Sequence, residues 1–172
     1  MKAKILLFIL CSGIGFSGPA LAAGSPFYLG LKAGRMMVDV SEFEDANSVG
    51  LVAGYKFFDG ASGSLAVEGE YTNSSSADIT VLGVTGKWDI DTLAVYLAYR
   101  SGGDLYLKGK IGYLDEEISA SIAGFGISGS DSGLSVGIGG GWKIGANSAL
   151  ELEYTMIEED ANFLSLGVNF SF

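Results

Sequence analysis

The nine residues Leu164–Phe172, Leu-Ser-Leu-Gly-Val-Asn-Phe-Ser-Phe, alternate apolar side chains with small or polar ones. Successive side chains of a strand point to opposite faces, so one face of this stretch carries five apolar residues and the other carries four small or polar ones. Soluble sheets usually protect an edge strand with charge or a polar tail, and this strand has neither. The pattern predicts a terminal strand whose edge is paired and whose apolar face meets something other than water.

The first 22 residues have the pattern of a secretory signal peptide. Met1–Lys4 is a short basic segment, Ile5–Phe16 is apolar, and Ala20–Ala22 is the small-x-small pattern that a signal peptidase cuts. The apolar run is too short to span a bilayer as a helix. We therefore expect a signal peptide at 1–22 and a single domain at 23–172.

The composition of residues 23–172 excludes several classes of function. The one cysteine, Cys11, precedes this part, and the chain has no histidine, which removes disulfides, thiolate or imidazole metal ligands, and His-dependent catalysis. Lys2 and Lys4 also precede it, so eight basic residues stand against twenty acidic ones, a net charge of −12. Such a charge argues against nucleic-acid binding through a basic patch. We expect no metal, no cofactor and no nucleic-acid partner.

Alternation recurs between the two ends of the chain and predicts eight strands. Their approximate ranges are 27–36, 49–57, 64–72, 92–100, 105–114, 133–144, 149–157 and 163–172. Short turns are expected at Asp59-Gly60, Gly102–Asp104 and Gly145–Asn147. The intervening stretches are mostly longer and more polar, and the Gly-rich Ile122–Ser130 predicts a flexible loop. Alternating long and short connections are typical of an antiparallel up-and-down barrel.

Charged and apolar residues separate onto opposite faces of the predicted strands. The apolar phase, which runs from Phe27 to Ala33 on the first strand and includes Val67, Val95 and Val136 on later ones, contains no charge at these positions. The opposite phase holds Lys32, Lys56, Glu68, Glu70, Arg100, Lys108, Lys110, Lys143, Glu151 and Glu153. A Lys or Arg that faces lipid at mid-bilayer costs about 2–4 kcal/mol, so these residues must point inward. A soluble barrel has the opposite arrangement, and the pattern therefore predicts an all-β, eight-stranded transmembrane β-barrel.

The phase of the apolar residues changes just before the fourth predicted strand, whose outward residues run from Leu93 to Tyr99. Trp88 and Ile90 are apolar in the phase that is expected to point inward. A β-bulge near Asp91 would reconcile the two parts, and so would a strand that leaves the membrane at this point. Thr80–Val84 also has the pattern of a hairpin that extends above the bilayer.

The interior of an eight-stranded barrel is just wide enough for its own side chains. Glu68 and Glu70 on the third strand, and Glu151 and Glu153 on the seventh, should face basic residues across the lumen. Two hypotheses follow: an internal salt-bridge network that plugs the barrel, or a gated, narrow path for ions. An enzymatic role is not expected, because the chain lacks histidine and the lumen offers no wide pocket.

Three acidic clusters lie in the predicted long loops. They are Asp39–Asp45, Asp115–Glu117 and Glu158–Asp160, and none has the spacing of an EF-hand. One interpretation is that they keep the outer rim solvated. The other is that they share divalent cations with lipopolysaccharide phosphates or with an external ligand.

Four segments resemble the OmpA/OmpX-like family of eight-stranded outer-membrane β-barrels of Gram-negative bacteria: Phe27–Gly30, Ala98–Arg100, Leu105–Tyr113 and Val168–Phe172. The resemblance implies short periplasmic turns, long extracellular loops, an outer-membrane location, and contact with lipid and lipopolysaccharide. Phe170 and Phe172 match the terminal aromatic pattern by which the barrel assembly machinery receives its clients.

We expect a monomeric structural or surface-interaction protein with a charge-plugged lumen and acidic extracellular loops. A narrow porin-like channel or transporter for small solutes is the alternative.

Overall fold

The structure is a computed structural model that describes residues 25–38, 44–81, 84–122, 125–157 and 161–172. The expected signal peptide at 1–22 lies outside these residues. The described strands are β1 (Phe27–Val38), β2 (Ala46–Gly60), β3 (Gly63–Ser74), β4 (Ala77–Val81), β5 (Val84–Ser101), β6 (Leu105–Ile122), β7 (Phe125–Lys143), β8 (Ser148–Met156) and β9 (Ala161–Ser171). No helix long and apolar enough to cross a membrane occurs in the described part of the chain.

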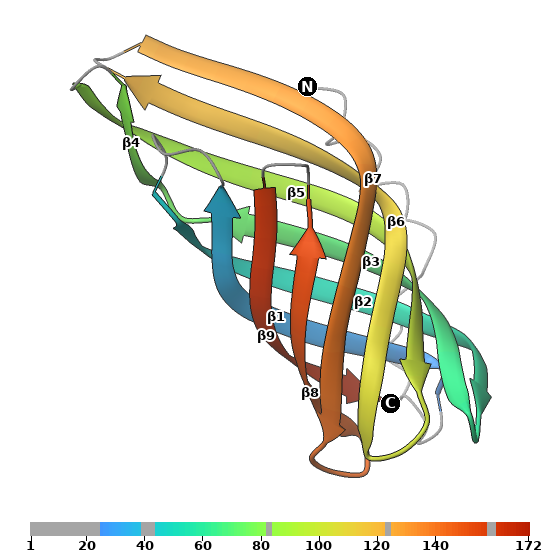
Figure 1. Ribbon diagram of the computed structural model, residues 1–172. Coiled ribbons are helices and arrows are strands. Elements are labelled where there is room, and N and C mark those ends of the chain that lie inside the picture. Colours follow the sequence, from blue (N-terminus) through green and yellow to red (C-terminus); the bar gives the residue numbers. More distant parts are fainter. Residues whose placement is uncertain (1–24, 39–43, 82–83, 123–124, 158–160) are drawn as a thin grey trace, which may run out of the picture.

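Eight of these strands close into an antiparallel barrel (Figure 1). Each strand pairs with its neighbour in sequence, except that β3 pairs directly with β5, and β4 pairs only with the first residues of β5. The barrel is closed by β1 and β9, whose register runs from Tyr28 opposite Ser171 to Val38 opposite Ala161. The terminal strand therefore has a paired edge, as predicted.

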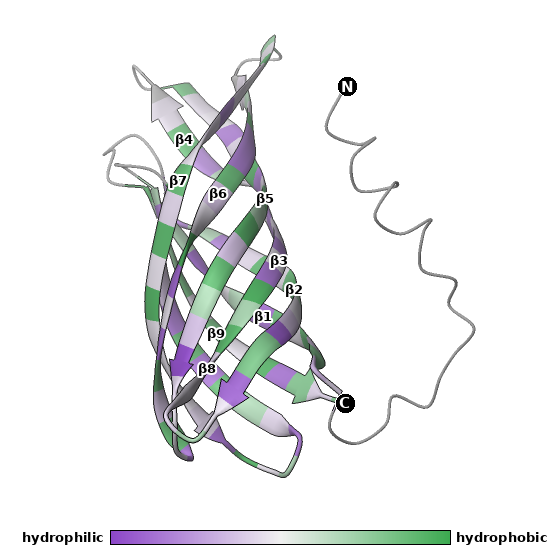
Figure 2. Cartoon of the chain, turned by 90° about the vertical axis from the view of Figure 1, so that its right-hand side faces the viewer, coloured by the Kyte–Doolittle hydropathy of each residue, from purple (hydrophilic) through white to green (hydrophobic). Residues whose placement is uncertain are grey.

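The predicted partition of side chains is confirmed along the barrel wall. Apolar residues of one phase are exposed on the outside, such as Leu29 (53 % exposed) and Val95 (59 %). Residues of the opposite phase are buried inside, such as Lys108 (2 % exposed). Figure 2 shows the resulting alternation of hydrophobic and hydrophilic residues along each strand. Because ionised groups fill the interior and apolar groups cover the outside, this is a barrel built for a lipid environment.

Tight turns connect the strands at one end of the barrel, at two of the predicted positions and, for the predicted Asp59-Gly60 turn, directly after it. Residues 61–62 join β2 to β3, residues 102–104 join β5 to β6, and residues 144–147 join β7 to β8. Gly103 has φ +107°, a conformation that favours glycine, which explains the Gly-Gly pair in that turn. We call this the short-turn end.

At the opposite end the structure resolves the conflict of phase in β5. The strand runs unbroken over 18 residues, and its pairings with β3, β4 and β6 contain no register shift. Trp88 and Ile90 point inward in the same phase as Tyr96, and all three are buried. The bulge proposed near Asp91 is absent from the described β5, so the strand instead leaves the lipid zone with its phase unchanged.

Two stretches expected to be loops are mostly strand, and the predicted Thr80–Val84 hairpin is confirmed, because β4 pairs antiparallel with the start of β5. Most of 73–91 belongs to β4 and β5, and the described residues of 115–132 belong to β6 and β7. The Gly-rich segment Ile122–Ser130 therefore contributes Phe125–Ser130 to a strand rather than to a flexible loop. Beyond the membrane both faces of a strand can meet water, so apolar alternation weakens and serine and glycine replace it.

The longer strands give the barrel an asymmetric shape. We define the extension as β4 with Val84–Thr92 of β5, Leu114–Ile122 of β6 and Phe125–Ser135 of β7. Figure 1 shows these segments running well past the ends of β8, β9 and β1. At the long-loop end, the side of the barrel formed by β4 to β7 therefore extends further than the side formed by β8, β9 and β1.

Candidate functional site

Eight of the ten charged residues predicted to point inward come together in the lumen. They are Lys32 on β1, Glu68 and Glu70 on β3, Arg100 on β5, Lys108 and Lys110 on β6, and Glu151 and Glu153 on β8. We call these residues the lumen network. It contains four basic and four acidic side chains, so its formal charge is zero. Its side chains are almost fully buried; Arg100 is the most exposed, at 12 %.

The level of the network nearer the long-loop end joins two lysines to two glutamates. Lys110 Nζ lies 2.8 Å from Glu70 Oε2 and 2.7 Å from Glu153 Oε1. Lys32 Nζ lies 2.9 Å from the same Glu70 oxygen and also contacts Glu153. Lys110 additionally lies over the ring of Tyr96, 4.1 Å from its centroid. Each carboxylate is thus shared by two cations, which compensates for its removal from water.

The level nearer the short-turn end is organised by Arg100 and Lys108. Arg100 donates to Glu68 at 2.5 Å and to Glu151 at 2.7 Å, and Lys108 lies 3.1 Å and 3.0 Å from the same two carboxylates. Lys108 also reaches Glu153 at 2.7 Å, which links this level to the one above. The network therefore connects strands from all sides of the barrel.

Two inward tyrosines, which sequence reasoning did not identify, complete this level. Tyr28 donates a 2.5 Å hydrogen bond to Glu68, and Tyr106 donates one of 2.7 Å to Glu151. Each ring lies against a glycine directly opposite on the neighbouring strand, Gly54 and Gly141 respectively. A Cβ on Gly54 would be 2.0 Å from Tyr28 Cζ, so the ring needs a glycine there. A tyrosine opposite an inward glycine was the available signal.

Two predicted members, Lys56 and Lys143, do not join the network. Both lie at the mouth of the short-turn end, where Lys143 is exposed and Lys56 is 3.5 Å from Asp59. In β2 the register with β3 shifts between Lys56 and Phe58, close to the end of the strand. The prediction that these two lysines belong to the lumen charge network is therefore wrong, because both lie at the rim of the barrel, where their side chains line the mouth cavity instead of the closed interior.

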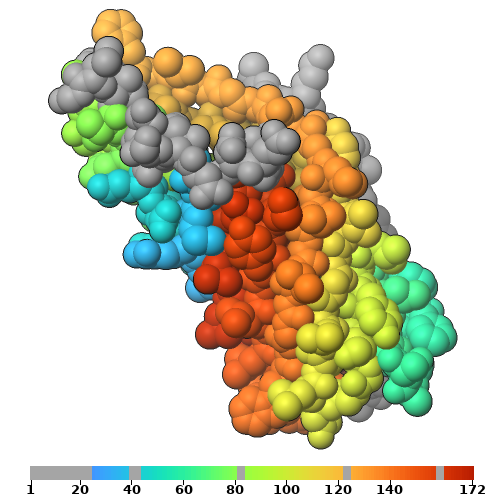
Figure 3. Space-filling model, in the orientation of Figure 1, coloured from blue at the N-terminus to red at the C-terminus, as the bar shows by residue number. Residues whose placement is uncertain are grey.

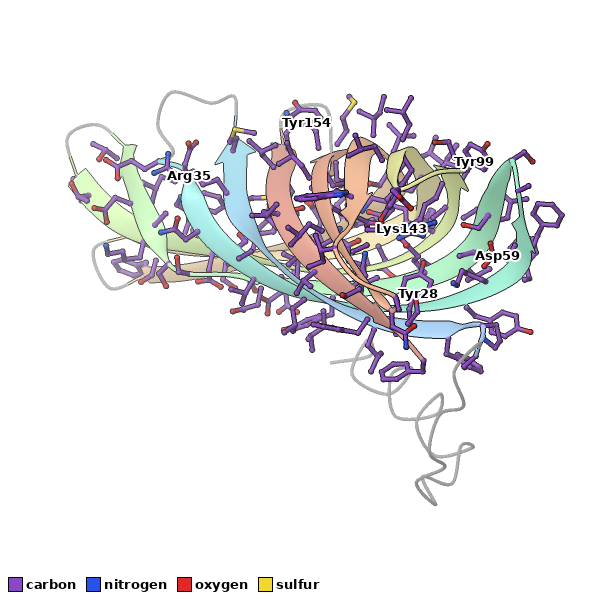
Figure 4. The ribbon with its side chains drawn as sticks, turned by 90° about the horizontal axis from the view of Figure 1, so that it is seen from below. Tyr28, Arg35, Asp59, Tyr99, Lys143 and Tyr154 are labelled. Atoms are coloured by element: carbon purple, nitrogen blue, oxygen red, sulfur yellow. The ribbon has the colours of Figure 1, made fainter. Side chains whose placement is uncertain are left out.

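The mouth of the short-turn end is an open cavity of about 590 Å³. Figure 4 views the molecule from this side and shows Tyr28, Lys143 and Asp59 around the mouth, with Tyr99 on the outer surface. Tyr28, Arg100, Tyr106 and Glu151 also line the cavity, and all four belong to the polar contacts described above. The cavity therefore ends at the lumen network.

A second filling, which the sequence analysis did not predict, lies between the network and the long-loop end. Its largest buried side chains are Met36, Trp88, Ile90, Tyr96, Leu114 and Phe163. We call this cluster the apolar layer. The indole of Trp88 donates to Glu44 O at 3.2 Å, which connects the layer to the residues just before β2. The lumen is thus closed by an ionic level and then by an apolar one.

The acidic clusters do not form a metal site in the described residues, where no group of three or more His, Cys, Asp or Glu side chains could hold an ion. Residues 39–43 and 158–160 lie outside the described part of the chain. Asp115 and Glu117 point outward from β6, whereas Glu116 points inward and is buried. A strand separates neighbours in this way, so that triplet cannot converge on one cation.

The two terminal aromatic residues differ in environment. Phe170 is exposed on the outer surface of β9, and Phe172 lines the mouth cavity, where its N–H lies 3.3 Å from Phe27 O.

A family model described as the outer membrane protein beta-barrel domain matches residues 8–172. The chain belongs to this family. It is accordingly a protein of the Gram-negative outer membrane. No curated protein matches the sequence.

Solved structures share the fold at low sequence identity. The chain is similar to Neisserial surface protein A (18 % identity, TM-score 0.67, covering 86 % of this chain and 98 % of that one). It is also similar to Ail, the attachment invasion locus protein of Yersinia pestis, in complex with the heparin analogue sucrose octasulfate (18 %, 0.58, 85 % and 96 %). A third similar structure is the outer membrane enzyme PagL (14 %, 0.52, 84 % and 99 %). Because these neighbours include an enzyme, the fold alone does not decide the activity.

Proposed function

We propose that this chain is a closed outer-membrane barrel whose role is to display an interaction surface outside the cell. The observation that carries the proposal is the double filling of the lumen. A charge-balanced ionic level blocks the periplasmic half, and the apolar layer blocks the extracellular half. An ion entering from the periplasmic mouth would have to separate several buried ion pairs and then cross an apolar barrier.

A narrow channel is the alternative, and the same fillings weigh against it. Water-filled transmembrane barrels are much wider than eight strands, because an eight-stranded interior is filled by its own side chains. The mouth cavity provides polar space only as far as Arg100. The proposal therefore treats that cavity as a blind vestibule.

We propose further that the protein is not an enzyme. The whole chain lacks histidine. The buried carboxylates Glu68, Glu70, Glu151 and Glu153 all accept hydrogen bonds or ion pairs from lumen cations. A general acid or base needs access to a substrate, and these groups are enclosed by their partners.

We do not expect this chain to bind the kind of ligand that is present in the Ail structure. That structure contains a polysulfated ligand, which basic side chains would bind. The outward face of the extension here carries Asp89, Asp91, Asp115 and Glu117 instead. A polyanion is therefore disfavoured as a ligand, and the proposed surface role concerns a different kind of partner.

We also propose that lipid and lipopolysaccharide surround the barrel, and that Phe170 and Phe172 act as its assembly signal.

Conductance across a planar bilayer tests the closed lumen. The refolded full domain is expected to give no steady current steps under conditions in which a sixteen-stranded porin conducts. Slower migration after boiling than before would show that the inserted barrel is folded. Reproducible steps of constant size from the folded wild-type protein would contradict the proposal and favour the channel.

A further inference from the structure

Strand β7 has an open edge outside the membrane. It pairs with β6 from Phe125 to Trp142 but with β8 only from Val136 to Lys143. We call Phe125–Ser135 the β7 edge. No described strand pairs with it on the side away from β6. Figure 3 shows the orange atoms of β7 extending to the upper end of the molecule, past the red atoms of β9.

The pattern of backbone hydrogen bonds identifies the free groups of this edge. Lys143 N–H donates to Asp104 O on the β6 side at 2.8 Å, and the β6–β7 register continues to Phe125 without a shift. Backbone groups alternate in direction along an antiparallel strand, so odd-numbered residues face β6 and even-numbered residues face away. Gly126, Ser128 and Ser130 therefore direct N–H and C=O groups away from β6, where no described strand pairs with them. The next even residue, Ser132, donates its N–H to the Asp131 side chain at 2.7 Å.

The inward face of the extension is apolar along the outermost part of this edge, at Phe125 and Ile127, whereas Asp131 lies further along the same face, opposite Glu116. On the inward face, Trp88 of β5 is directly opposite Ala120 of β6, and Ala120 is directly opposite Ile127 of β7. Trp88 is buried in the apolar layer, but Ile127 is 72 % exposed and Phe125, two residues further, is 79 % exposed. The apolar layer thus continues across β6 to the free edge of β7, where the side chains of Ile127 and Phe125 are exposed. An added strand with an apolar side chain beside Ile127 would cover it.

The other face of the extension is acidic. Glu117 is opposite Ser130 in the register and opposite Asp91 on its other side, so two carboxylates lie directly across from each other. The neighbouring cation on this face, Lys87, pairs with Asp78. The small side chains of Ser128 and Ser130 leave the acidic row open from the edge. A long basic side chain on an added strand could reach across them toward Glu117.

We propose that the β7 edge binds an extended segment of another protein by strand addition, and that this segment alternates apolar and basic residues. This inference rests on the proposed surface role and names its partner class. The backbone of the edge would supply the hydrogen bonds, Ile127 and Phe125 the apolar contact, and the acidic face the preference for Lys or Arg. A second copy of this chain is disfavoured, because pairing two β7 edges would bring two acidic faces together.

Binding of designed peptides to the folded domain in phosphocholine nanodiscs tests the proposal. The probe is a dye-labelled nine-residue peptide of alternating Lys and Val, and its control has Glu in place of Lys. We expect the Lys peptide to bind at least about tenfold more tightly than the Glu peptide. It should also slow amide hydrogen exchange at Gly126, Ser128 and Ser130. Equal affinity of the two peptides, or no protection at these amides, would overturn the proposal.

A matched pair of variants isolates the backbone contribution. The double variant Ser128→Pro, Ser130→Pro removes two edge N–H groups but none that bonds β6, and it should weaken binding at least about tenfold. Ser128→Ala with Ser130→Ala keeps both N–H groups and should bind within about twofold of wild type. Heat-dependent gel migration verifies that each variant is folded. Undiminished binding by the folded proline variant would overturn the proposal.

Two further outcomes separate this inference from others. A wild-type dimer in nanodiscs or detergent that the proline variant converts to a monomer would assign the edge to a second copy instead. Conductance is measured on the same preparations. A barrel that shows no conductance and binds no peptide contradicts only the strand-addition proposal. A barrel that conducts contradicts the closed lumen, whether or not it binds the peptides.

Discussion

Lys108 Nζ lies 2.7 Å from Glu153 Oε2, and this ion pair joins the two levels of the lumen network. The same ammonium group is 3.1 Å from Glu68 and 3.0 Å from Glu151. One buried cation therefore compensates three carboxylates that come from opposite sides of the barrel. The stability of the closed lumen should depend strongly on it.

Replacing this cation is expected to destabilise the barrel. Lys108→Met keeps a side chain of similar length but leaves three buried carboxylates with too little positive charge. Breaking a buried ion pair on one side costs about 3–5 kcal/mol, and we expect a loss of that size in urea unfolding from lipid vesicles. Lys143→Met removes an exposed lysine at the mouth and should leave the unfolding free energy unchanged. Equal effects of the two substitutions would contradict the assigned role of Lys108.

The contact between Tyr28 and Gly54 predicts a steric effect. Gly54→Ala would place a Cβ 2.0 Å from Tyr28 Cζ, and the ring could move only by losing its hydrogen bond to Glu68. Overpacking of this kind costs about 1–3 kcal/mol. Gly109→Ala is the control, because a Cβ there meets no atom within 4 Å. Equilibrium unfolding should show a loss for the first variant and none for the second.

The apolar layer predicts a large cavity effect at Trp88. Its side chain is 1 % exposed inside the barrel, so Trp88→Ala should reduce the unfolding free energy by about 3–5 kcal/mol. Trp142, which faces outward and is 55 % exposed, provides a matched substitution with a smaller effect. Conductance should stay absent in Trp88→Ala, because the lumen network remains beneath the cavity. Steady current in this variant would show that the ionic level alone does not close the lumen.

The topology predicts where an introduced cysteine can be labelled. Ser128→Cys on the β7 edge should react with a membrane-impermeant maleimide on intact cells. Ala61→Cys, in the turn between β2 and β3, should react only after the outer membrane is permeabilised. Val95→Cys faces lipid and should resist the reagent in both cases. Labelling of Ala61→Cys on intact cells would mean that the short-turn end faces the outside of the cell, the reverse of the expected orientation.

The alternating pattern of Leu164–Phe172 and the segregation of charges decided the fold class without any structure. A period of two fixes which face each side chain takes, and the cost of a charge in lipid fixes which face points outward. For this reason the transmembrane partition and the short turns were predicted correctly. The same reasoning placed eight charged residues in the lumen. It also assigned Lys56 and Lys143 to the lumen network, because periodicity does not reveal how far along a strand the closed interior extends.

Only the tertiary structure decided what lies beyond the membrane and which groups meet inside it. The segment Ile118-Ser-Ala-Ser-Ile122 does alternate, yet its serine and glycine surroundings resemble a loop, because a strand in water needs no apolar outer face. Pairing of Trp88 with Ala120 and of Ala120 with Ile127 depends on the registers of three strands that are distant in sequence. The apolar layer, the shared partners of Lys108 and the open β7 edge arise from strand length and register, which are set when the barrel closes.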